Sequence, residues 1–141
     1  MSFLLVVHVL AAGLWLGCLA TEIAFEKAMA VDAAARGFVS RLHDRVDRFV
    51  EGPAFVTVLA SGLVLLPQVA LTPGLLIKIG LGGAAVVLNV WCLKIVFDRA
   101  SAAREGRVAD WERLDHLQHR VGGGVTLLLV AAVLVGLGRG V

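Results

Sequence analysis

The sequence predicts an all-α integral membrane protein, a single four-helix transmembrane domain spanning residues 1–141. Of the residues, 59% are hydrophobic and only 17% are charged, which excludes an ordinary soluble domain. Apolar runs cover residues 3–20, 49–70, 75–96 and 121–137. Each is as long, or nearly as long, as the roughly 20 residues that a helix needs to cross a bilayer, and none shows the alternation of a β-barrel. Short connections then favour an up-down-up-down bundle.

The basic residues predict the orientation of this bundle. Eleven of them lie in the segments 21–48 and 94–120, whereas the opposite side carries only Lys78 and Arg139. Because cytoplasmic segments of membrane proteins are enriched in Lys and Arg, we expect both segments to be cytoplasmic and both termini to lie outside. A bacterial inner membrane is the expected location. The acidic residues also gather on the inner side, and nothing in the charge pattern indicates nucleic-acid binding.

Local signals predict where the helices begin, bend and end. We expect the first helix to stop at Gly37 and Ser40 to cap the second. Pro53 should kink or loosen the second helix, because proline lacks a backbone N–H. Thr72, which precedes a proline, is the expected cap of the third helix, and Asp110 that of the fourth.

One face of the first helix is polar at both ends. At about 100° per residue, His8, Trp15, Glu22 and Glu26 share this face. His8 lies near the outer membrane surface, as does Lys78 on the third helix. Two interpretations remain open: His8 forms a hydrogen bond to a neighbouring helix while Lys78 reaches the interface, or the imidazole ligates haem iron.

Acidic and imidazole side chains also gather at the predicted inner surface. The spacings E-x-x-x-E, H-x-x-x-D and H-x-x-H each place two ligand-type side chains on one helical face, as in the metal sites of helix bundles. Such ligands suit iron, copper, zinc or manganese. The cluster comprises Glu22, Glu26, His43, Asp44, Asp47, Glu51, Asp115, His116 and His119. The predicted metal ligands are Glu22, Glu26, His43, Asp47, His116 and His119. The alternative is a salt-bridge network, because arginines are interleaved with these residues.

Several short motifs resemble a known superfamily. His8, Trp15 and Gly17 are similar to the first helix of the HemJ-type protoporphyrinogen oxidases and of the related CopD-like copper-resistance proteins. The second helix resembles theirs through Arg45, Pro53, Thr57 and Gly62, and the segment Gly74-Leu75-Leu76-Ile77-Lys78 resembles the start of their third helix.

The resemblance implies a four-helix membrane protein, and in the HemJ branch it implies haem b and oxidation of protoporphyrinogen IX. His8 would then be the haem ligand and Lys78 the catalytic lysine, with Trp15 and Asn89 also at the cofactor. Asn89 stands where the family has a histidine, and Ala24 where it has an arginine. We therefore expect a divergent member with its own haem or metal role.

Three functions follow from these observations. The first is a haem- or metal-binding protein with a redox or metal-handling role, which as an enzyme would be a membrane oxidoreductase. The second is a transport element for copper or another cation, and the third is a structural subunit of a larger membrane complex. Beyond the lipid bilayer, a homodimer or such a complex is the expected assembly. The sequence contains neither a phosphate-binding loop nor a dinucleotide fingerprint.

Overall fold

A computed structural model describes residues 2–31 and 33–138, and these residues are almost entirely helical, as predicted. Four helical segments within them are long and apolar enough to cross a membrane, so the chain is an integral membrane protein. The elements in order are α1 (Phe3–Val31), η1 (Ala33–Ala35), α2 (Arg36–Val46), η2 (Asp47–Glu51), α3 (Gly52–Leu65), η3 (Leu66–Gln68), α4 (Pro73–Arg104) and α5 (Val108–Leu137). Arg139, one of the two basic residues on the predicted outer side, lies outside the described residues.

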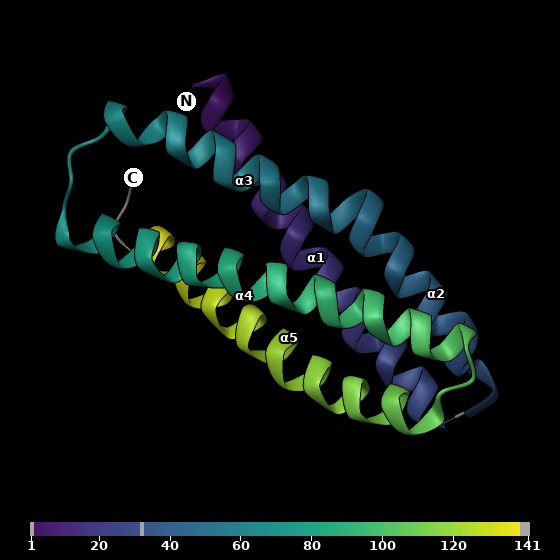
Figure 1. Ribbon diagram of the computed structural model, residues 1–141. Helices are drawn as coiled ribbons and strands as arrows, with labels where there is room; N and C mark the ends of the chain where they lie inside the picture. The colour runs from purple at the N-terminus through teal and green to yellow at the C-terminus, as the bar shows by residue number, and fades with distance from the viewer. Residues whose placement is uncertain (1, 32, 139–141) are drawn as a thin grey trace.

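The helices form two side-by-side pairs (Figure 1). Helices α4 and α5 pack against each other extensively, and α1 packs mainly against α3. Helix α2 joins the pairs through its contacts with α4, whereas α3 barely contacts α4. Both chain ends lie at one end of the molecule, and the α1–α2 connection and the α4–α5 turn lie at the other. We call these the outer and inner ends, after the orientation that the charges predict.

Some predicted helix boundaries are confirmed and others are wrong. Thr72 caps α4, because its Oγ1 accepts a hydrogen bond from the Leu75 amide at 3.2 Å. Gly37 and Ser40 lie inside α2, which begins at Arg36 after a short 3₁₀ turn. Asp110 is not a cap either, because α5 begins at Val108.

The second spanning segment is interrupted by a wide π-helical turn, η2, just before Pro53. The Gly52 amide donates to the Asp47 carbonyl, five residues earlier, instead of to the carbonyl four residues earlier. Pro53 has no N–H to continue the α-helical ladder, which is the physical reason that a proline disturbs the helix here. Asp47 and Glu51 both lie in this turn and are only 3% and 2% exposed. Single π turns of this kind are frequent at functional sites.

The apolar core is small and is centred between the two pairs. Trp15 is fully buried there, with its ring centroid 5.8 Å from that of Phe55. Among the glycines of α5, Gly124 makes the closest approach: a Cβ at this position would lie 2.9 Å from Leu88 Cδ2 of α4. Large apolar side chains such as Phe49 and Leu127 point outwards and are 76% and 73% exposed. A bilayer provides the apolar surroundings that these side chains need.

Candidate metal centre

The inner end of the bundle encloses a cluster of charged side chains around His43. Helix α1 contributes two carboxylates and η2 another two, while His43 itself comes from α2. Helices α4 and α5 close the cluster with an arginine and a glutamine. The buried members are Glu22, Glu26, His43, Asp47, Glu51, Arg99 and Gln118.

Hydrogen bonding determines which nitrogen of His43 is free. Its Nδ1 lies 3.0 Å from Glu26 Oε1, a carboxylate oxygen that also accepts a hydrogen bond from Arg99 Nη2 at 2.8 Å. Arg99 Nη2 lies 3.1 Å from the same Nδ1, and the Gln118 amide nitrogen lies 3.3 Å from both ring nitrogens. We place the imidazole proton on Nδ1, where it is donated to Glu26, so that Nε2 carries the lone pair. A carboxylate that fixes the far nitrogen of an imidazole is the usual support of a histidine that ligates a metal.

The free nitrogen faces two further carboxylates. His43 Nε2 lies 3.2 Å from Glu22 Oε2 and 3.7 Å from Asp47 Oδ1. One ligand atom from each of these residues lies within 4.8 Å of the others. Zinc bonds to nitrogen and oxygen are about 2.0–2.2 Å long, so tetrahedral ligand atoms stand roughly 3.3–3.5 Å apart. The three side chains therefore have nearly the separation that a metal ion requires.

The charges in this cluster do not balance among the described residues. Four buried carboxyl groups face one buried arginine. Within the described ranges, the only other buried group that could contribute positive charge is His43, which is either neutral or carries a single charge. Several buried carboxylate oxygens also have no hydrogen-bond partner in the part of the chain that the structure describes. These are Glu22 Oε1, Glu26 Oε2, Asp47 Oδ1 and Glu51 Oε2. An unpaired buried charge costs several kcal/mol, so these carboxyl groups must either carry a proton or have a cation beside them.

Arg99 ties the cluster together and was not among the sequence-predicted residues. Its Nη1 donates to Asp115 Oδ1 at 2.6 Å and its Nη2 to Glu26 Oε1 at 2.8 Å, and the residue is completely buried. A signal for it does exist in the sequence, because Asn89, Cys92 and Arg99 share one buried face of α4 at helical spacing. Gln118 was also missed; its Nε2 lies 3.3 Å from His43 Nε2.

The structure separates the other predicted metal ligands. Glu26, Asp115 and His119 form a second group at the edge of the cluster, where His119 is exposed. His116 lies one step around α5 and is exposed. Within the described residues it is not among the ligand-type side chains that come together, so the buried site is assembled without it.

At the outer end, His8 is held by the α3 helix. Its Nδ1 lies 2.9 Å from Ser61 Oγ, whose single proton is donated to the Thr57 carbonyl at 2.5 Å. With its proton on Nδ1, His8 donates to Ser61, and its ring also has a hydrogen bond with the Val58 backbone. Lys78 lies along α5, where a Cβ on Gly136 would be 3.1 Å from Lys78 Nζ.

The residues expected at a haem differ in their exposure. Trp15 and Asn89 are both 0% exposed and are enclosed by protein side chains, whereas His8 is only half-buried. A haem that touched Trp15 and Asn89 would have to displace the side chains around them. Asn89 also has no hydrogen-bond partner for its side-chain amide within the described part of the chain. Of the expected cofactor residues, His8 alone has the form of a ligand.

No family model, curated protein or solved structure matches this chain. The geometry of the inner cluster is therefore the basis for assigning a function, and the resemblance to the HemJ- and CopD-like proteins stays a prediction.

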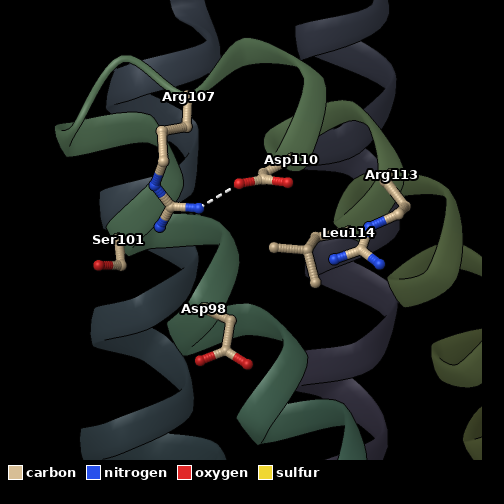
Figure 2. A pocket seen from close by; sticks show the side chains of 6 residues that line it. All are labelled: Asp98, Ser101, Arg107, Asp110, Arg113 and Leu114. Carbon is tan, nitrogen blue, oxygen red and sulfur yellow. Dashed lines mark hydrogen bonds and ion pairs between the residues drawn. The ribbon is translucent and has the colours of Figure 1, made fainter.

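A separate surface pocket of about 230 Å³ lies at the α4–α5 turn (Figure 2). Three of its four charged groups are already paired: Arg107 binds Asp110, and Asp98 accepts a hydrogen bond from Lys94 at 2.7 Å. Hydrogen bonds from Ser101 and Arg107 also lower the pKa of the neighbouring Glu105. This pocket is a solvated ion-pair surface, in contrast to the buried cluster with its unpaired oxygens.

Proposed function

We propose that this integral membrane protein binds a divalent transition-metal ion at its inner end, through His43 Nε2, Glu22 and Asp47. The observation that carries the proposal is the set of buried carboxylate oxygens around His43 that have no hydrogen-bond partners among the described residues. Nδ1 of this imidazole is held by Glu26, and Nε2 faces Glu22 and Asp47. Glu26, which the sequence placed among the ligands, acts in this site by orienting His43. Glu51 adds negative charge beside Glu22.

The ligand set narrows the choice of ion and its role. Nitrogen and carboxylate ligands suit zinc, iron, manganese or copper. They do not suit calcium, which takes oxygen ligands only. Three protein ligands leave one position of a tetrahedral ion open, as in reactive sites and unlike closed structural ones. A redox or metal-handling role follows from this open position. With iron or copper bound, the protein would be a membrane oxidoreductase, and with zinc a metal-handling protein.

The test is metal binding to the detergent-purified full chain. We expect about one ion per chain by elemental analysis, and added Co²⁺ should develop the visible absorption of a low-coordinate site. Asp47→Asn should weaken metal binding by at least about tenfold, because it removes a charged ligand. The same change should raise the melting temperature of the metal-free protein, because it removes an unpaired buried charge.

The matched control is Glu112→Gln, an exposed carboxylate on α5 that lies 3.9 Å from Arg36. This variant should bind metal like the wild type. The proposal fails if the wild type contains and binds no metal, or if Asp47→Asn and Glu112→Gln bind it equally well. Metal-free folding with unchanged stability in every variant would instead indicate the structural-subunit role.

A second candidate is haem b on His8, which would place the protein near the HemJ-type oxidases. It is favoured by one observation, the 2.9 Å contact between His8 Nδ1 and Ser61 Oγ, which orients the imidazole. Haem would supply one-electron chemistry, and His8 would hold it while Ser61 fixes the imidazole. The visible spectrum of protein expressed with ample haem decides this: a Soret band that disappears in His8→Ala supports it, and its absence from the wild type removes it.

A further inference from the structure

The two carboxylate oxygens of Glu26 face different surroundings. Oε1 is occupied by His43 and Arg99 inside the cluster. Oε2 has no hydrogen-bond partner among residues 2–31 and 33–138, although Glu26 is only 9% exposed. It faces His119 Nε2 across 3.8 Å. A buried, unpartnered carboxylate oxygen thus points at the edge of the cluster.

His119 offers a free nitrogen to this oxygen. Its Nδ1 lies 2.8 Å from the Asp115 carbonyl, one helical turn earlier, and donates to it. The Nε2 lone pair is left unused and faces Glu26. Asp115 adds a second carboxylate, with Oδ2 3.7 Å from His119 Nδ1.

Exposure falls stepwise along these side chains. The side chain of His119 is 49% exposed, that of Asp115 is 17% exposed and that of Glu26 is 9% exposed, while His43 behind them is 3% exposed. Glu26 and Glu22 are four residues apart on α1 and therefore neighbours on one helical face. The ligand-type groups form a line from the surface to the buried site.

We propose that His119 Nε2 and Glu26 Oε2 form a second cation site, which captures a divalent transition-metal ion at the inner surface and delivers it to Glu22, His43 and Asp47. The inference rests on the proposed metal site and adds the route by which that site fills. Delivery exchanges His119 for His43 as the imidazole ligand and breaks no covalent bond.

The local charges make this capture site weak. Arg99 Nη2 lies 2.8 Å from the other oxygen of Glu26, so its positive charge opposes a cation at Oε2. The buried site is also near Arg99, whose Nη2 lies 3.1 Å from His43 Nδ1, but it offers two carboxylates, Glu22 and Asp47, beside one imidazole nitrogen. A weak outer site beside a stronger inner one increases the rate at which the inner site binds its ion, and it leaves the affinity of the inner site unchanged.

The experiment is stopped-flow mixing of the detergent-solubilised full chain with Co²⁺, followed by visible absorption. In His119→Ala we expect association and dissociation to slow by the same factor, about tenfold, since an attractive group near a site raises the on-rate by about 10-fold or more. The equilibrium Kd and the final absorption should match the wild type. His116→Ala is the matched control, an exposed histidine on the same helix, and should show wild-type rates.

Each outcome has one meaning. No Co²⁺ binding by the wild type overturns the proposed metal site itself. Normal binding with wild-type rates in His119→Ala overturns the capture site alone. A weaker Kd with a lower melting temperature assigns His119 a structural role and also overturns it.

A second measurement covers failure of His119→Ala to fold. Diethylpyrocarbonate modifies exposed imidazoles, and mass spectrometry reports each histidine separately. We expect millimolar Zn²⁺ to protect His119 in the wild type while His116 stays reactive. Equal modification of His119 with and without Zn²⁺ would rule out the capture site.

Discussion

Arg99 joins the buried cluster around His43 to the second group of Glu26, Asp115 and His119 at its edge. Its guanidinium binds Glu26 on one side and Asp115 on the other, and none of it reaches solvent. Arginine suits this position because it stays charged when buried and donates several hydrogen bonds in fixed directions. It holds Glu26 so that one oxygen fixes His43 and the other faces His119.

We predict that Arg99→Met destabilises the protein by about 3–5 kcal/mol, because it leaves two carboxylates buried without their cation. Lys94→Met is the control on the same helix: Lys94 pairs with Asp98 at 2.7 Å, but both side chains are more than half exposed. Its loss should change stability by less than about 1 kcal/mol. The free energy of unfolding in detergent measures both. Similar values for the two variants would contradict the central role of Arg99.

At this scale the sequence identified the acids and histidines of the site, but it could not rank them. Counting at helical spacing brought Glu22, His43 and Asp47 to one end of the bundle. It could not show that Glu26 orients His43, because that depends on which side chain reaches each imidazole nitrogen. It also could not separate His116 from His119, since the rotation of α5 is set by its packing against α4.

Among the elements, the π turn η2 is the one that shapes the site. It contains the buried Asp47 and Glu51, and both side chains interact with Glu22 of α1. Gly52 is required where this turn closes: a Cβ there would lie 2.9 Å from the Asp47 carbonyl oxygen. That oxygen belongs to the backbone, which cannot move without changing the turn.

We predict that Gly52→Ala destabilises the protein by about 1–3 kcal/mol and weakens metal binding, because overpacking against the backbone displaces Asp47. Gly82→Ala on α4 is the control, since nothing lies within 4 Å of a Cβ at that position. Alanine there should be neutral or stabilising by up to about 1 kcal/mol, as its helix propensity predicts. Thermal unfolding and Co²⁺ titration of both variants provide the measurement. An unchanged Co²⁺ affinity in Gly52→Ala would contradict the role given to the turn.

The four spanning helices could be predicted from hydropathy and length, and the Thr72 cap from local sequence. The π turn could not be predicted, although Pro53 marked its place. A proline determines which backbone hydrogen bond of the helix is lost, but it does not determine which hydrogen bonds form around that point. The wrong boundaries at Gly37, Ser40 and Asp110 have a similar cause. Tertiary contacts decide them; Ser40, for example, accepts a hydrogen bond from Trp111 Nε1 at 3.1 Å in the folded chain.

For the whole molecule, the distribution of charge and the placement of the chain ends agree with one orientation in the membrane, with both termini outside. Both chain ends lie at the end opposite the charged cluster around His43 (Figure 1), and the predicted cytoplasmic segments lie at the cluster end. With this orientation the metal site would exchange ions with the cytoplasm, because His119 is exposed at that end.

We predict that a membrane-impermeant maleimide labels Ser2→Cys but not Ala109→Cys in intact bacterial cells, because positively charged segments stay cytoplasmic. Opening the cells should make both positions reactive. The native Cys18 and Cys92 are buried and should give little background. Labelling of Ala109→Cys in intact cells, with Ser2→Cys silent, would reverse the orientation and place the metal site outside.

The π turn has a consequence for the helix that contains it. A π turn holds one residue more than an α turn, so it rotates the rest of the helix by about 100° relative to an uninterrupted one. Before the turn, α2 faces α4; after it, α3 faces α1. Asp47 and Glu51 of the inner cluster and the Ser61 that contacts His8 therefore belong to one continuous helix, and the turn fixes the rotation of one part relative to the other. Unwinding the turn at the inner end would swing Ser61 away from His8 at the other end of the helix.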